Sequence, residues 1–231
     1  MFTKDLKEFA KECKEGYKVG HPFPHLVIDG LFDPPILAAA VDNLPTFTKN
    51  WTVWKSRNEL KRGLQGQHLS SCHARVQEVL SAMNAEYFVD FLKEVVDVPT
   101  LQSDDTYLGG GIHQIPPGGK LGIHVDFSKN KELWRRANCL LYLNRDWKEE
   151  YGGHLDLYDN SPLRGGVLVK RVLPVFNRLV IFGTTLDSWH GHPEPLTCPP
   201  HRMRSSFATY YYSTEQGVDS GDHSTIWGTE G

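Results

Sequence analysis

The chain has 231 residues, of which 39% are hydrophobic and 23% charged, and its formal net charge is -3. This length is enough for a buried core, and the balanced charge gives no sign of a nucleic-acid partner. No stretch approaches the roughly 18 apolar residues of a membrane helix, and lysines and glutamates interrupt residues 1–17, where a signal peptide would be apolar. We therefore expect a cytoplasmic protein without a membrane anchor.

The four cysteines give no sign of cross-linking or of a zinc site. Cys13, Cys72, Cys139 and Cys198 are spread along the chain without a short paired spacing. A zinc knuckle needs such a pair, and a disulfide framework is typical of short secreted chains. We expect all four to be free thiols.

The first hundred residues carry mainly helical patterns. Apolar residues recur at three- and four-residue steps over 2–16 and again over 76–96, as on an amphipathic helix. A third helix is predicted over 34–43, because two prolines at its start suit a first helical turn. Residues 25–28 form an apolar run typical of a short strand. We expect residues 1–100 to be a mainly helical support region.

The pattern changes after residue 100. From 101 to 212, short runs of β-branched and aromatic residues alternate with glycine pairs such as Gly152-Gly153 and Gly165-Gly166, which is typical of an all-β barrel or sandwich. Residues 213–231 are rich in serine, threonine, glycine and aspartate, so we expect a polar tail that is loose or only partly docked. The sequence predicts one domain over residues 1–231, with its catalytic core at 101–212.

A histidine and an aspartate two residues apart suggest a metal site. On a strand, alternate side chains share a face, so His124 and Asp126 can reach one ion. A second histidine from a distant strand would complete two imidazoles and one carboxylate, the ligand set of non-haem Fe(II) oxygenases. His190 is our candidate, and His192, on the same strand face, is a rival. The alternatives are a surface ion pair for the first two residues and a packing histidine for His190.

Six sequence blocks occur here in the same order as in a known enzyme family. They are QIPPGGKLGIHVD (114–126), CLLYLNRDW (139–147), GGHL (152–155), NRLVIF (177–182), WHGHPEPL (189–196) and RSSFATYYY (204–212). Together they resemble the core of the prolyl-hydroxylase type of 2-oxoglutarate- and Fe(II)-dependent oxygenase. Residues 23–32 also resemble the opening of bacterial and phage members, so the resemblance extends over most of the chain.

The resemblance implies a fold, a set of cofactors and a reaction. The fold is mainly β within the α+β class: a double-stranded β-helix, related to jelly rolls and cupins, with N-terminal helices packed against one sheet. Fe(II) is the implied cofactor, with 2-oxoglutarate and O2 as cosubstrates and ascorbate as an accompanying reductant. His124, Asp126 and His190 become the expected metal ligands and catalytic residues. Related halogenases lack the carboxylate, so the presence of Asp126 favours hydroxylation.

The resemblance also implies a binding site for 2-oxoglutarate. Arg204 and Ser206 match an Arg-x-Ser motif that binds the distal carboxylate, and the planar guanidinium suits a carboxylate. Arg202 has the same strand parity and remains a competitor. Three further positions match residues that contact or enclose the cosubstrate: Tyr142, Asn138 and Leu155. A buried aromatic on a sheet is the alternative interpretation of Tyr142.

Four other residues are weaker candidates near the metal or the substrate. Gln114 stands where the resembling enzymes carry a tyrosine near the metal. Arg135 either faces the substrate or is a solvated surface arginine. His192 is a candidate for a supporting position beside the ligands, and His113 lies either in the pocket or simply within a strand.

The sequence leaves the substrate and the oligomeric state open. The first hypothesis is a hydroxylase for a prolyl or other residue of a protein or peptide, and the second is the same chemistry on a free amino acid or small metabolite. The third is a non-catalytic or zinc-binding β-barrel. The basic segment 55–67 is the expected loop for a substrate-binding finger or lid, although such charge runs are usually a solvated face.

Overall fold

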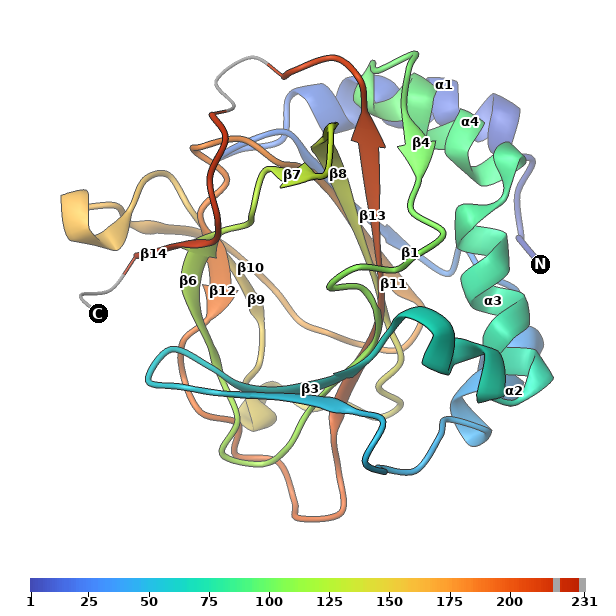
Figure 1. Ribbon diagram of the computed structural model, residues 1–231, viewed down its shortest axis with the longest axis vertical. Helices are drawn as coiled ribbons and strands as arrows, with labels where there is room; N and C mark the ends of the chain where they lie inside the picture. Colours follow the sequence, from blue (N-terminus) through green and yellow to red (C-terminus); the bar gives the residue numbers. More distant parts are fainter. Residues whose placement is uncertain (218–220, 229–231) are drawn as a thin grey trace.

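The computed structural model describes residues 1–217 and 221–228, which form two antiparallel sheets and a layer of helices (Figure 1). The major sheet has the order β1 (His25–Asp29), β11 (Arg178–Gly183), β8 (Leu133–Tyr142), β13 (Arg204–Ser213), β5 (Gly111–Ile115), β3 (Leu60–Leu64) and β2 (Thr52–Lys55), with β4 (Gln102–Ser103) beside β13 and β7 (Lys129–Asn130) beside β8. The minor sheet has the order β10 (Leu168–Val172), β9 (Leu155–Tyr158), β12 (His190–His192), β6 (Leu121–Val125) and β14 (Ile226–Trp227). This is the expected double-stranded β-helix.

The alternation of side chains along the major sheet separates two cores. In β8, Cys139 and Leu141 belong to the apolar core that includes the helices. Tyr142, one residue further along, packs instead with Leu155 of the minor sheet and with Phe182. Successive side chains on a strand point to opposite faces, so a strand buried on both faces supplies both cores. The inner core keeps the two sheets apart and surrounds the polar residues described below.

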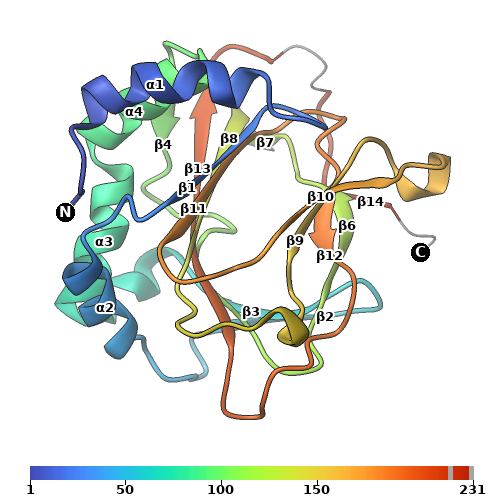
Figure 2. The same cartoon turned by 180° about the vertical axis from the view of Figure 1, so that it is seen from behind.

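The helices cover the outer face of the major sheet, as the sequence predicts (Figure 2). They are α1 (Leu6–Lys18), α2 (Pro34–Asp42), α3 (Ala74–Asn84) and α4 (Glu86–Val96). Asp5 caps α1 by accepting hydrogen bonds from the first-turn amides of Lys7 and Glu8. Phe9 of α1 stacks on Phe91 of α4 at 6.1 Å between ring centroids, so these two helices pack together. The residue 76–96 region is two helices, joined at Ala85.

The segment 55–67 is not the expected loop, because most of it belongs to a β-hairpin. β2 pairs with β3, and β3 pairs with β5 through partners such as Gly63 and His113. Lysine and arginine are tolerated on these strands because their cationic groups lie over aromatic rings: the Lys61 ammonium over Trp54 and the Arg62 guanidinium over Phe47. The N-terminal region therefore supplies both edges of the major sheet, β1 on one side and the hairpin on the other.

The described part of the C-terminal tail docks against the minor sheet. In β14, Ile226 pairs with Val125 and Trp227 with His124. His223 and Ser128 bond to each other as well: each backbone amide donates to an oxygen of the other residue. The tail is thus partly docked, as one of our expectations had it, whereas positions 218–220 and 229–231 lie outside the described residues. Within the described ranges, no helix combines the length and apolar character that crossing a membrane requires.

Candidate active site

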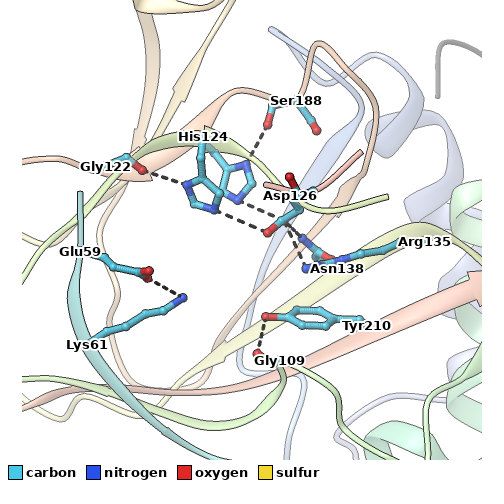
Figure 3. A network of polar contacts seen from close by, with 12 residues as sticks. Glu59, Lys61, Gly109, Gly122, His124, Asp126, Arg135, Asn138, Ser188 and Tyr210 are labelled. Atoms are coloured by element: carbon cyan, nitrogen blue, oxygen red, sulfur yellow. Dashed lines mark hydrogen bonds and ion pairs between the residues drawn. The ribbon is translucent and has the colours of Figure 1, made fainter. Parts of the chain in front are cut away.

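Three side chains that could hold a metal ion, here called the metal-binding group, meet at strands β6 and β12. His124 and His190 are direct partners in the antiparallel register, and their ring centroids are 4.5 Å apart. Asp126 follows the end of β6; its Oδ1 lies 3.5 Å from Nε2 of His124 and its Oδ2 lies 3.4 Å from Nε2 of His190 (Figure 3). Among residues 1–217 and 221–228, this is the group of histidine, cysteine and acidic side chains whose ligand atoms converge for one ion.

Both histidines are held in the tautomer that a metal requires. Nδ1 of His124 lies 2.8 Å from the carbonyl oxygen of Gly122, and Nδ1 of His190 lies 2.8 Å from that of Ser188. A carbonyl oxygen only accepts, so Nδ1 carries the proton in each ring and the lone pair remains on Nε2. Two Nε2 atoms and one carboxylate form a donor set that suits Fe(II), so the residues present fit this ion.

Burial and neighbouring charge favour the metal-binding protonation states. Burial opposes the charge on Asp126, but the Arg135 guanidinium together with His190 and His124 outweighs it, and the pKa of Asp126 stays well below its usual range. Burial of the ring, together with the neighbouring His124, lowers the pKa of His190 to about 4. At neutral pH the carboxylate is therefore charged and the His190 imidazole is neutral, and a metal binds both in these forms.

Arg135 is buried next to the Asp126 carboxylate, so the alternative of a solvated surface arginine is wrong. Its side chain lies between the rings of Phe127 and Tyr210, and the residue is only 2% exposed. Its Nη2 is 3.2 Å from Oδ2 of Asp126, and its Nε donates to Oδ1 of Asn138. The Asn138 amide in turn donates to the same Asp126 oxygen at 2.7 Å. The guanidinium therefore lies inside the barrel, where the faces of the two aromatic rings and the Asp126 carboxylate stabilise its positive charge.

Arg204 and Ser206 line the same cavity as the three metal-binding side chains. Arg204 is 5% exposed; its Nε donates to the carbonyl oxygen of Gly153 at 2.6 Å and its Nη2 donates to the hydroxyl of Tyr142 at 3.2 Å. Gly153 has a φ of +70°, and a Cβ there would lie 2.8 Å from Cδ of Arg204. A glycine is therefore required for the arginine to lie against this turn.

Arg202, the competitor of Arg204, is directed elsewhere. Its Nη1 donates to the carbonyl oxygen of Arg145, and its guanidinium lies 5.8 Å from the centroid of the Tyr151 ring. It does not line the cavity that contains Arg204. Arg202 and Arg204 are two residues apart, so on one strand their side chains would share a face. Arg202, however, precedes the start of β13, where side chains do not yet alternate between the two faces.

Gln114 does not approach the metal-binding side chains. Its Oε1 accepts hydrogen bonds from Nε and Nη2 of Arg62, on the face of β5 that is turned away from the cavity. His113, one residue earlier and hence on the opposite face, lines the cavity instead. Burial, with the nearby charge of Lys61, lowers the pKa of His113 to about 3, so this imidazole is neutral. Leu155 lines the cavity as well.

Sequence reasoning missed Lys61, which reaches the cavity from β3. Its ammonium is 3.4 Å from Glu59 (Figure 3). Strand periodicity is the signal that would have found it. Lys61 is two residues before Gly63 and therefore on the same face of β3, and Gly63 pairs with His113 of β5. His192 lies in the cavity as well and stands apart from the metal-binding group.

The comparisons with known proteins agree with this geometry. A family model described as the 2OG-Fe(II) oxygenase superfamily matches residues 110–212, the segment that contains every residue of the expected metal and cosubstrate sites. Residues 110–212, a little under half of the chain, thus match the 2-oxoglutarate- and Fe(II)-dependent oxygenases. The matched family implies Fe(II), 2-oxoglutarate and O2, and the His124, Asp126 and His190 group agrees with the metal.

The oxygenase is also similar to named relatives. It is 25% identical over 232 residues to a prolyl 3-hydroxylase of Xenopus laevis. The alignment covers 95% of this chain but only 43% of that relative. The chain thus spans less than half the length of this curated relative. Its fold matches that of a Pseudomonas putida prolyl-4-hydroxylase, at 16% identity and a TM-score of 0.59, over 89% of this chain and 98% of the other.

A second solved structure shows that the same fold serves more than one reaction. It is the non-haem α-ketoglutarate-dependent epimerase SnoN from nogalamycin biosynthesis, at 10% identity and a TM-score of 0.61, over 89% of this chain and 83% of the other. The fold alone therefore does not identify the substrate.

Proposed function

We propose that this oxygenase hydroxylates an unactivated C–H bond of a prolyl or other residue in a protein or peptide. The observation that carries the proposal is a single cavity with a ready-made metal-binding group, His124, Asp126 and His190, and a buried arginine, Arg204. A metal cation and an anionic cosubstrate both need such fixed partners away from bulk water.

Each end of the cavity has a distinct role in the proposal. His124, Asp126 and His190 hold Fe(II), while Arg204 and Ser206 bind the distal carboxylate of 2-oxoglutarate. Bound iron with 2-oxoglutarate supplies the oxidation, in which O2 converts the cosubstrate to succinate and CO2 and places one oxygen atom on the substrate carbon. Tyr142 supports the anion site, because its hydroxyl fixes Nη2 of Arg204.

The remaining cavity residues orient the reactants and keep water away. Apolar side chains line the space between the two ends: Ile115, Leu140, Leu155 and Phe182. They limit the solvent that reaches the oxidant, a task the protein performs while the cofactor carries the chemistry. Because Asp126 occupies the third protein position at the metal, halide has no vacated position to take, which favours hydroxylation.

A protein or peptide substrate is supported by the relatives. The similarity to the Xenopus laevis prolyl 3-hydroxylase extends over 95% of this chain. A free amino acid or small metabolite is the alternative that an assay must distinguish, because the same site residues serve both substrate classes.

The test is succinate formation from 2-oxoglutarate with Fe(II) and ascorbate, measured with prolyl peptides and, separately, with free amino acids. We expect stimulation by peptides and its loss in Asp126→Ala. Asp156→Ala is the control, since Asp156 is a more deeply buried aspartate that pairs with Arg171 outside the metal-binding group. Turnover that survives Asp126→Ala would contradict the proposed chemistry, and stimulation by free amino acids alone would contradict the proposed substrate.

A further inference from the structure

One buried side chain in the cavity has no partner. His192 lies on β12 two residues after His190 and is 3% exposed. Both of its ring nitrogens are buried, and neither forms a hydrogen bond with the described residues. By contrast, His124 and His190 each use Nδ1 to bond a backbone carbonyl.

An unpartnered imidazole is costly to bury. In either neutral tautomer it has one N–H donor and one acceptor nitrogen, and both lose their water when the ring is buried. Native proteins satisfy nearly all such groups with a protein atom, a water molecule or a ligand. Because His192 lines the cavity of Arg204 and Ser206, a ligand in that cavity is within the reach of the ring.

The surrounding charges indicate what kind of ligand this is. Arg204 and Lys61 are the positively charged residues whose charge acts most strongly on His192. A cation is repelled at this end, and His192 is not part of the group of ligand atoms that converge for a metal. An anion is attracted, and the imidazole N–H is a donor that an anionic oxygen accepts.

Arg204 alone leaves part of a carboxylate unbound. Its Nε and one N–H of its Nη2 are already used, by the Gly153 carbonyl and the Tyr142 hydroxyl. The two oxygens of an incoming carboxylate offer about four acceptor sites, so they can accept a donor besides the guanidinium and the Ser206 hydroxyl. A third donor is available from β12 of the minor sheet, in the ring of His192.

We infer that His192 donates a hydrogen bond to the distal carboxylate of 2-oxoglutarate and so selects a dicarboxylic 2-oxo acid as cosubstrate. The inference rests on the proposed function, because it assigns a further residue to the same anion site. His192 is thereby a specificity-determining residue, and its contribution disappears when the distal carboxylate is absent.

The test compares two ligands that differ only in that carboxylate. Dissociation constants of 2-oxoglutarate and of 2-oxopentanoate, which ends in a methyl group, are measured by calorimetry on the Mn(II)-loaded full chain without turnover. We expect His192→Leu to weaken 2-oxoglutarate binding roughly tenfold or more, as the loss of a hydrogen bond to a charged group does. Binding of 2-oxopentanoate should stay within about twofold, and His192→Gln, which keeps an N–H donor, should retain much of the affinity for 2-oxoglutarate.

A control and a second measurement guard against misfolded variants. His25→Leu removes another buried histidine that does not line the cavity, and it should leave both affinities unchanged. In the wild-type Zn(II) form with ¹⁵N-labelled histidine, the ring resonances of His192 should move when 2-oxoglutarate binds and stay in place with 2-oxopentanoate.

Four outcomes would overturn the inference. Equal weakening of both ligands in His192→Leu would mean that the residue acts through its neighbour His190. If His192→Leu changes neither dissociation constant, or if the His192 ring resonances do not move when 2-oxoglutarate binds, His192 is only a packing residue. Failure of the wild-type protein to bind 2-oxoglutarate at all would overturn the proposed function itself and this inference with it.

Discussion

The two ends of the cavity are prepared for their ligands in opposite ways. At the metal end, the Nδ1 atoms of His124 and His190 are tied to carbonyls, and Asn138 and Arg135 hold one oxygen of Asp126. At the other end, Arg204 uses only part of its hydrogen-bonding capacity on the protein, and His192 uses none. A cation site needs lone pairs fixed in direction, whereas an anion site needs N–H groups that are still free.

This difference makes the two ends separable by experiment. Changes at the metal end should abolish metal binding and all that depends on it. Changes at the anion end should spare the metal and weaken only 2-oxoglutarate. The predictions below use this distinction, from the largest expected effect to the smallest.

Removal of the carboxylate should have the largest effect. In Asp126→Ala we expect Fe(II) affinity to fall by more than about 100-fold, beyond the loss that a supporting residue causes, because a direct ligand is gone. Metal titration followed by a succinate assay measures it. Asp156→Ala should lower the melting temperature while it keeps metal affinity; if both variants lose metal equally, Asp126 has no special role.

The guanidinium at the opposite end comes next. Arg204→Met should weaken 2-oxoglutarate binding by roughly 10- to 100-fold, because a charge-assisted pair is lost, and it should leave Mn(II) affinity unchanged. Calorimetry with each ligand tests both halves of the statement. Arg202→Met is the matched control and should bind 2-oxoglutarate normally. If Arg202→Met weakens binding and Arg204→Met does not, Arg202 and not Arg204 binds the cosubstrate.

The neighbour of Asp126 should have a smaller effect that depends on pH. Arg135 holds the pKa of Asp126 down against burial, which raises it. In Arg135→Met the pKa of that carboxyl should rise, so metal binding should be lost at a higher pH as the solution is acidified, with affinity at neutral pH reduced by about 10-fold. Mn(II) titrations across pH measure the shift.

A matched arginine shows whether the effect is local. Arg171→Met removes a comparable partner from the buried Asp156, and the pH dependence of metal binding should not change. Methionine keeps an apolar stem between the Phe127 and Tyr210 rings, so the Arg135 variant should still fold. An unchanged pH profile in Arg135→Met would show that the guanidinium does not control Asp126.

The smallest effect is expected from the C-terminal strand. The ring of Trp227 lies 5.2 Å from the ring of His124 between centroids, and β14 pairs with the strand that carries this histidine. Trp227→Ala should lower Mn(II) affinity about threefold, in line with the modest energy of an aromatic pair. Trp134→Ala removes a ring that lies under Lys129 and does not line the cavity, and it should not lower Mn(II) affinity. Equal losses of Mn(II) affinity in Trp227→Ala and Trp134→Ala would mean that the C-terminal tail stabilises only the fold and not the metal-binding group.

Strand periodicity and the ordered motifs were enough to predict the fold and to bring most candidate residues into one cavity. The fold class, the helical layer and the shared strand face of Arg204 and Ser206 follow from local patterns of apolar residues. These patterns repeat every two residues in strands and every three to four residues in helices. Gln114 shows the limit of motif alignment: a shift of one residue on β5 turns it away from the cavity and puts His113 there.

Contacts between distant segments were beyond the reach of the sequence. The burial of Arg135 depends on Tyr210, 75 positions later, and Lys61 enters the cavity only because β3 pairs with β5. A charged residue on an isolated hairpin looks solvated until the partner strand is known. The docking of Trp227 against His124 likewise depends on a pairing that no local pattern announces.

The most direct test of the account is the visible absorption of the protein with Fe(II) and 2-oxoglutarate under anaerobic conditions. Chelation of the 2-oxo acid by protein-bound iron gives a charge-transfer band. We expect the band in the wild type, its absence in Asp126→Ala, and its appearance in Arg204→Met only at much higher 2-oxoglutarate concentration. A wild-type protein that binds Fe(II) tightly but gives no band with 2-oxoglutarate would contradict the proposed site.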